Sequence, residues 1–311
     1  VYADSTKGWL PLEDDVVADE PVAPPTQKAI FAYGHNGGYV SMSNLVSSSG
    51  VVAADVTGVG TARRGSAGVG YGTDKAIIGY GYTGSYVSMT NLISNSGVVA
   101  TDTTGVGTAR YQLAAAGYGV GLAIIGYGYT GSRTAITNLV NSSGVVATDV
   151  SGVGSTRYGL AAAEYGGDKA IFGYGYISGA VSMTNLVSNS GVVSADVSGV
   201  GSARQDLAAA GYGTDKAIFG YGDAGGYTSI TNLVSNTGVV AADVSGVGTG
   251  RVSPAGASYG GDKAIFAYGF ITGSYTAISS LVSNSGVVAA DVTGVGTIRK
   301  ATGAAGFSLS A

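Results

Sequence analysis

One segment occurs six times in tandem, and this repeat constrains the fold more than any other feature of the sequence. Each copy opens with a motif close to Lys-Ala-Ile-Phe-Gly-Tyr-Gly, and an arginine that recurs with almost the same period marks a second position. The copies start at Lys28, Lys75, Leu122, Lys169, Lys216 and Lys263, each 47 residues after the one before. Six units of this length predict an array of identical supersecondary elements.

Each copy contains short segments that are typical of β-strands. The opening motif is one strand, the stretch ending Thr-Asn-Leu-Val is a second, and Gly-Val-Val-Ala-Ala-Asp-Val after a Ser-Asn-Ser-Gly turn is a third. The stretch Leu-Ala-Ala-Ala-Gly-Tyr-Gly after the arginine is the fourth. No segment has the apolar periodicity of a helix. Four strands in each of six copies predict an all-β, six-bladed β-propeller.

The two ends of the repeat region complement each other. The array begins at Lys28 with the second strand of a copy, and it ends with a spare first strand over 301–310. We expect this C-terminal strand to complete the first blade and close the ring. A β-solenoid is the alternative, although 47 residues is long for one coil, and a transmembrane barrel would show aromatic girdles instead of six equal units. The predicted domains are an arm over 1–27 and a propeller over 28–311.

The repeat resembles the blade of kelch-type propellers. The matching order is an arginine, a small-residue strand, a glycine-ended strand and an outer strand, as from Arg110 through Ile124 to Thr137. The chain has Tyr-Gly where kelch repeats have a Gly-Gly doublet, and Val-Val near the kelch tryptophan position. The resemblance implies blade topology. The near-identical copies, rich in Gly, Ser, Asn and Tyr, also resemble repeat proteins of marine bacteriophages, of virion or tail-fibre type.

The first 27 residues differ in composition from the repeats. They carry six of the 19 acidic residues, one of the 15 basic ones, four of the five prolines and the only tryptophan. Such a segment is typical of an extended acidic arm that becomes ordered on a partner. We expect this arm to bind a protein partner, with Trp9, Leu10 and Leu12 as its anchor.

The composition excludes several kinds of chemistry. The 311 residues include no cysteine and a single histidine, His35, so disulfides, cysteine-bound metals and multi-histidine sites are impossible. A net charge of −4 argues against a general nucleic-acid binder. The Gly-x-Gly-x-x-Gly match at Gly79 precedes a strand and not the helix that a dinucleotide site needs. We expect no metal, cofactor, nucleic-acid partner or membrane span.

Residues that recur in every copy are expected to form the scaffold. An aspartate in each copy is predicted to cap backbone N–H groups, and the marker arginine to bridge neighbouring blades. Two tyrosine series in register, which begin at Tyr33 and Tyr71, are predicted to fill the core. The predicted structural rings are Asp55, Asp102, Asp149, Asp196, Asp243 and Asp291, with Arg63, Arg110, Arg157, Arg204, Arg251 and Arg299.

Tyrosines outside those series gather at two positions of the repeat that a propeller places on one face. These positions are the loop after the Tyr-Gly strand and the residue after the marker arginine, and the copies differ most from one another there. Tyrosine offers flat stacking area and a hydroxyl, so an uneven tyrosine face indicates ligand recognition. The predicted ligand-binding residues are Tyr39, Tyr82, Tyr86, Tyr129, Arg133, Tyr176, Tyr227 and Tyr275, with Tyr111 and Tyr158.

These features predict a non-enzymatic structural or recognition module. The unshared residues on the tyrosine face that could act as an acid or a base, His35, Asp206 and Asp223, belong to different copies. No motif links them, so we expect no catalytic residues. The predicted setting is a virion or an extracellular surface, where the face would contact a glycan, a host receptor or a neighbouring subunit. The alternatives are a free secreted lectin-like propeller that binds carbohydrate, and an enzyme with polar groups converging on the central channel.

Overall fold

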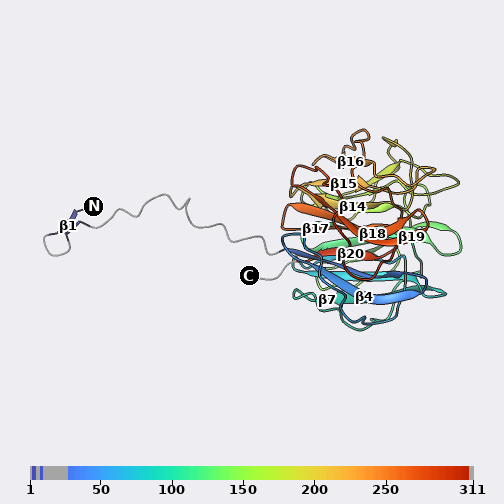
Figure 1. Ribbon diagram of the computed structural model, residues 1–311, viewed down its shortest axis with the longest axis horizontal. Coiled ribbons are helices and arrows are strands. Elements are labelled where there is room, and N and C mark those ends of the chain that lie inside the picture. The colour runs from blue at the N-terminus through green and yellow to red at the C-terminus, as the bar shows by residue number, and fades with distance from the viewer. Residues whose placement is uncertain (1, 5–7, 10–26, 308–311) are drawn as a thin grey trace.

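The computed structural model describes residues 2–4, 8–9 and 27–307, and within them the chain is all-β (Figure 1). Two short strands near the N-terminus, β1 (Tyr2–Asp4) and β2 (Gly8–Trp9), pair with each other. The remaining strands form six three-stranded antiparallel sheets, each with an inner, a middle and a third strand. This described part contains no helix that is long and apolar enough to cross a membrane.

The six sheets follow the six copies of the repeat. In order of inner, middle and third strand they are β5 (Ala67–Tyr71), β6 (Lys75–Tyr82) and β7 (Tyr86–Ile93); β8 (Ala114–Tyr118), β9 (Leu122–Tyr129) and β10 (Arg133–Val140); β11 (Ala161–Tyr165), β12 (Lys169–Gly173) and β13 (Thr184–Val187); β14 (Ala208–Tyr212), β15 (Lys216–Gly220) and β16 (Thr231–Val234); β17 (Ala255–Tyr259), β18 (Lys263–Ile271) and β19 (Ser274–Val282); and β20 (Gly303–Phe307), β3 (Lys28–His35) and β4 (Tyr39–Val46).

The last of these sheets joins the two ends of the repeat region. Strand β20, drawn in red in Figure 1, pairs antiparallel with β3 near the start of the chain, with Phe307 opposite Lys28. The prediction that the C-terminal strand completes the first sheet is therefore confirmed. The strand is shorter than the expected 301–310, because it begins at Gly303, and residues 308–311 lie outside the described part.

The prediction of four strands in each copy is wrong, because the Gly-Val-Val-Ala-Ala-Asp-Val segment forms no strand of the sheets. The outer segment that follows the third strand makes only isolated bridges, as where Ser43 meets Val56 and Val46 meets Val52. Between these bridges, the side-chain amide of Asn44 donates to the carbonyl of Ala53 at 2.9 Å. A side-chain amide thus donates where a regular strand pair would have a backbone N–H. The outer segment is irregular and mostly exposed.

The core lies between neighbouring sheets. The middle strands are buried on both faces, and a fully buried tyrosine with positive φ lies in each of them or directly after it. In β3 this residue is Tyr33, which lies at a register shift. The shift turns the ring into the space between two sheets, where the Tyr33 hydroxyl donates to the carbonyl of Val59 at 3.1 Å. Rings also meet across sheets, as Phe31 and Tyr268 do with centroids 5.3 Å apart. The first tyrosine series is therefore core, as predicted.

The inner strands surround a common axis. Each lies beside the inner strands of the two adjacent sheets, and β20 lies beside both β17 and β5. The packing is close enough to require small residues, since a Cβ on Gly68 would lie 2.5 Å from the carbonyl oxygen of Ala304. This explains the alanine- and glycine-rich composition of the inner strands.

A closed circle of backbone hydrogen bonds also surrounds the axis. Just before each inner strand, one residue with positive φ donates its N–H to the equivalent carbonyl of the preceding copy, at 2.7–3.0 Å. The donor from copy to copy is Gly65, Gln112, Gly159, Asp206, Ser253 and Ala301, and Gly65 in turn donates to Ala301. The sixth bond joins the end of the repeat region to its beginning, so the circle of backbone hydrogen bonds is closed.

This ring has two distinct ends. We call the end that carries the loops between middle and third strands the loop face, and the end that carries the turns between inner and middle strands the turn face. Each middle strand runs from the turn face to the loop face, as β3 does from Lys28 to His35. The circle of backbone hydrogen bonds lies at the loop-face end of the inner strands.

Candidate functional site

The repeated arginines are completely buried between sheets. Arg157 shows the common pattern: its Nε donates to the carbonyl of Tyr174 at 2.9 Å, and its Nη2 donates to Oδ1 of Asn185 at 2.6 Å. Its guanidinium lies 4.3 Å from the ring centroid of Tyr127 in the preceding sheet. Because all six copies keep the stacking contact, at 3.8–4.4 Å, these arginines link each sheet to its neighbour.

The repeated aspartates connect consecutive outer segments. Asp102 accepts hydrogen bonds from the backbone N–H of Thr61 at 2.9 Å and from its hydroxyl at 2.6 Å, and Asp55 does the same with Thr297. Burial alone would raise the pKa of Asp102, but the hydrogen bonds from Thr61 and Asn91 outweigh it, so the pKa lies below the ordinary value. The carboxylates therefore stay ionised, and they are already occupied by scaffold contacts.

The tyrosines predicted for ligand binding all lie on the loop face, and their rings touch in a continuous aromatic arc. Neighbouring ring centroids are 5.2–6.3 Å apart, mostly in edge-on or tilted arrangements. In order around the ring, the arc consists of Tyr227, Phe270, Tyr275, His35, Tyr39, Tyr82, Tyr86, Tyr111, Tyr129, Tyr158 and Tyr176. Its members are half-buried or exposed, up to 41% for Tyr227.

The arc is interrupted at one place, between Tyr176 and Tyr227. Gln205 and Asp223 occupy the equivalent positions there and pair through their backbones. Arg133, the only non-aromatic residue among the predicted ligand-binding residues, lies near the Tyr176 end of the arc and donates to the carbonyl of Ile177 at 2.6 Å.

Sequence reasoning missed the residues that complete the arc on the other side. His35 and Phe270 bridge tyrosines of different copies, and the Tyr275 hydroxyl lies 3.0 Å from Nδ1 of His35. Arg64 and Lys300, which follow marker arginines where two other copies have tyrosine, lie over rings of the same arc. Both residues differ from the tyrosine at this repeat position, and this difference could have marked them in the sequence. Only the structure shows that both lie beside the loop that begins at His35.

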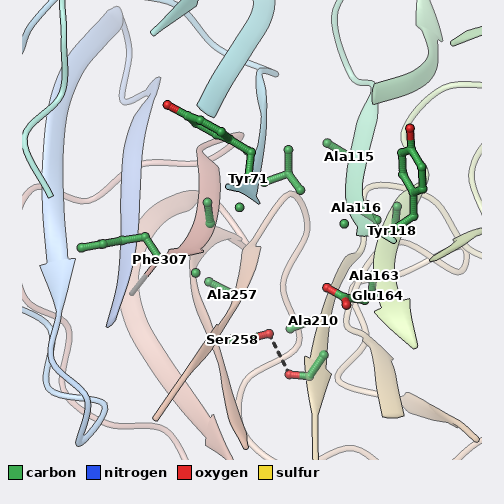
Figure 2. A pocket seen from close by; sticks show the side chains of 18 of the residues that line it. Tyr71, Ala115, Ala116, Tyr118, Ala163, Glu164, Ala210, Ala257, Ser258 and Phe307 are labelled. Carbon is green, nitrogen blue, oxygen red and sulfur yellow. Dashed lines mark hydrogen bonds between the residues drawn. The ribbon is translucent and has the colours of Figure 1, made fainter. Parts of the chain in front are cut away.

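The axis holds two cavities, one on either side of the small-residue strands. The larger, about 360 Å³, opens on the turn face, and its lining includes one acidic side chain, Glu164, and Ser258 from another inner strand (Figure 2). Glu164 reaches solvent at the cavity mouth, but protein surrounds it on several sides. Burial, aided by the negative charge of Asp168, raises the pKa of Glu164 to about 7. The sequence offered a signal here too, because the other inner strands have glycine or serine at this position.

The smaller axial cavity is at the loop-face end of the inner strands, and residues of the circle of backbone hydrogen bonds line it. There the side chain of Gln112 donates to Asp206 at 2.8 Å, next to Gly159. Burial raises the pKa of Asp206, although the Gln112 hydrogen bond and the charge of Lys300 act against it. Asp206 and Glu164 lie at opposite ends of inner strands, about 16 Å apart for five strand residues, so they are not paired for acid–base chemistry.

The predicted partner anchor belongs to the segment over 1–27. Leu10, Leu12 and the side chain of Trp9 lie outside the described residues, so the anchor prediction is not addressed by the structure. Among the described residues, no three His, Asp or Glu side chains come together as a metal site requires. No protein-family model matches the chain, and no curated protein matches it. The resemblance to kelch-type and bacteriophage repeats stays a prediction.

Proposed function

We propose that the six sheets are the blades of a β-propeller, and that the protein is a non-enzymatic recognition module whose loop face binds a macromolecular partner. The observation that carries this proposal is the aromatic arc. All nine predicted loop-face tyrosines join it, and each keeps part of its ring in solvent. Partly exposed tyrosines that already pack on one another lose little side-chain entropy on binding, which is typical of recognition surfaces.

The form of the arc favours a broad partner over a small molecule. The rings make a rim around the face, whereas the two axial cavities are lined by inner-strand residues and not by the rim tyrosines. Small ligands usually bind in concave sites that bury most of their surface. A rim of linked aromatic rings instead suits a surface that contacts several copies of the repeat at once.

We also propose a virion or an extracellular surface as the setting of the protein, with the arm as its connection to another subunit. The support is the six-fold scaffold, whose recurrent charged residues are engaged in structural contacts, and the different composition of residues 1–27. A free lectin-like propeller remains the competing proposal, and it predicts carbohydrate binding without any particle.

The test replaces Tyr82, Tyr86 and Tyr129 together with alanine. These rings lie on the surface of the arc and outside the buried core, so we expect folding to persist and binding to weaken at least tenfold. Wild-type and variant protein are assayed for co-sedimentation with particles from the native source and for binding to a glycan array. The matched control replaces Val51, Val98 and Val145, which are 60–65% exposed on the outer segments, with alanine.

The outcomes separate the alternatives. Loss of particle co-sedimentation in the tyrosine variant alone supports a protein or particle partner. Glycan binding that depends on the same tyrosines, without particle binding, supports the lectin-like alternative. Unchanged binding in both assays would refute recognition through this face.

A further inference from the structure

The loop face carries a basic sector made of Arg64, Lys300 and the loop that begins at His35. The guanidinium of Arg64 lies 5.5 Å from the ring centroid of Tyr82, and the ammonium of Lys300 lies 4.6 Å from that of Phe270. Lys300 and His35 also exchange backbone hydrogen bonds at 3.0 Å. Two cations thus border one loop, although they are separated by most of the chain.

The charge of this sector is not neutralised by ion pairs of the described residues. The repeated arginines and the lysines of the turns face nearby aspartates, but in the described part of the chain neither Arg64 nor Lys300 has a carboxylate within ion-pair distance. The Nε of Arg64 is buried without a hydrogen-bond partner. Burial and then the charges of Arg64 and Lys300 lower the pKa of His35, which is consistent with an uncompensated positive potential at the loop. Lys300 also acts on Asp206, at the axis.

The chain itself contains a segment of complementary composition. Residues 1–27 carry six acidic residues and Lys7, whereas the rest of the chain has 13 acidic and 14 basic residues. Glu13, Asp14 and Asp15 are consecutive, close to Trp9 and to Pro11. Carboxylates suit an arginine, and tryptophan and proline suit a face of tyrosine rings.

The arm joins the ring at the face opposite the basic sector. The carbonyl of Gln27 accepts a hydrogen bond from the N–H of Gly260 at 3.0 Å, and its side chain accepts one from Gly261 at 2.9 Å, both in a turn of the turn face. Strand β3 then leads from Lys28 to His35, so the attachment point and the basic sector are separated by the length of an eight-residue strand, about 25 Å.

We propose that the acidic arm of one copy binds the basic sector of a second copy, in a head-to-tail contact. This inference rests on the proposed role of the loop face in recognition and names the partner at one sector of it. The 26 residues before Gln27 can span up to about 85 Å, more than enough to reach a copy stacked against the turn face. A contact between opposite faces is heterologous, so it can repeat and build an open stack of rings.

The sole tryptophan makes the proposal measurable in the full-length chain. Because Trp9 is in the arm, its fluorescence reports docking without a label. We expect the Trp9 emission to shift to shorter wavelength and the sedimentation coefficient to rise together as protein concentration increases. Both changes should weaken with salt, because the contact pairs opposite charges.

Charge variants then locate the contact. The face variant carries Arg64→Gln and Lys300→Gln, and the arm variant carries Glu13→Gln, Asp14→Asn and Asp15→Asn. Each should associate with itself at least tenfold more weakly than the wild type. A one-to-one mixture should form dimers and no longer species, because only one arm and one face in each pair are intact. Lys169→Gln with Lys216→Gln, which removes two cations already paired with Asp168 and Asp215 in the turns, is the matched control and should leave association unchanged.

The remaining outcomes overturn the inference. If Trp9 emission and sedimentation do not vary with concentration, there is no contact between copies. If emission is shifted at every concentration and the face variant reverses it, the arm binds its own ring and the second-copy proposal is wrong. If the wild type associates but the face variant associates equally well, the basic sector is not the site. Loss of partner binding in the tyrosine variant would still support the proposed function in each case.

Discussion

The buried arginines offer a test of the scaffold within a single chain, because one of the six has different partners from the others. Arg157 makes hydrogen bonds of 2.9 Å to Tyr174 and 2.6 Å to Asn185. At the equivalent site of Arg251, the Nε has no hydrogen-bond partner, and a serine, Ser280, accepts from Nη2 at 3.1 Å. The Nη1 of Arg251 also pairs at 3.3 Å with Asp291, which is partly exposed. The two arginines therefore differ in their partners while both are completely buried.

Replacing each arginine with methionine gives different expected losses. In Arg157→Met, the carbonyl of Tyr174 and the Oδ1 of Asn185 lose their charged donor in a buried site, and about 3–5 kcal/mol of the free energy of unfolding should be lost. In Arg251→Met, Ser280 keeps its hydrogen bonds with the Tyr221 hydroxyl at 2.8 Å and with Asp291 at 3.0 Å. Fewer groups are left unsatisfied there, so we expect a loss of about 1–2 kcal/mol.

Equilibrium urea denaturation followed by tyrosine fluorescence and circular dichroism measures both losses. The comparison requires that the two probes give coincident transitions and that the slope with urea is the same in wild type and variants. Asn185→Ala, which removes the acceptor and keeps the arginine, checks that the large loss belongs to the hydrogen-bonded pair. Equal destabilisation by the two arginine substitutions, or a larger one at Arg251, would refute the argument that buried acceptors determine the cost.

Two other substitutions test the axis of the ring. The pKa of Glu164 is raised to about 7, so the folded state loses stability as pH rises from the unfolded value near 4.5 through 7. The substitution Glu164→Gln should remove this pH-dependent loss. The thermal midpoint of the variant should therefore exceed that of the wild type by more at pH 8 than at pH 5. Ala301 has a φ of 54° in the circle of backbone hydrogen bonds. Because alanine is strained in the left-handed region, Ala301→Gly should stabilise the protein by about 1 kcal/mol in urea denaturation, whereas an unchanged or lower midpoint would show that this strain is not significant.

The repeat period predicts most of the fold because equivalent residues form the same strands and pack in the same way in every copy. The positions of inner, middle and third strands follow from glycine turns and apolar runs, and the pairing of β20 with β3 follows from where the array begins and ends. The outer segment could not be predicted from propensity. Its Val-Val-Ala-Ala sequence favours a strand, but the amide of Asn44 takes hydrogen bonds that a fourth strand would otherwise make.

The candidate site was predictable in part, for a topological reason. Tyrosines at equivalent positions of the repeat must share a face, so their location follows from counting along the chain. The basic sector depends on ring closure instead. Arg64 belongs to the start of the repeat region and Lys300 to its end, and they become neighbours of His35 only because the last inner strand pairs with the first middle strand. The sequence alone does not indicate that these residues are neighbours, because they are far apart in the chain, although each of them differs from the repeat.

Departures from the repeat therefore carry more information than its recurring residues. The recurring Arg, Asp and buried Tyr side chains are fully engaged in holding one sheet to the next. Six equal sheets are equivalent binding positions, and only the places where the copies differ can distinguish one sheet from another. The differences cluster at the aromatic gap, at the basic sector across the face from it, and at Glu164 on the axis. A partner that binds in one orientation must contact at least one of these places, which is why the basic sector, and not the symmetric scaffold, is the strongest position at which to test binding.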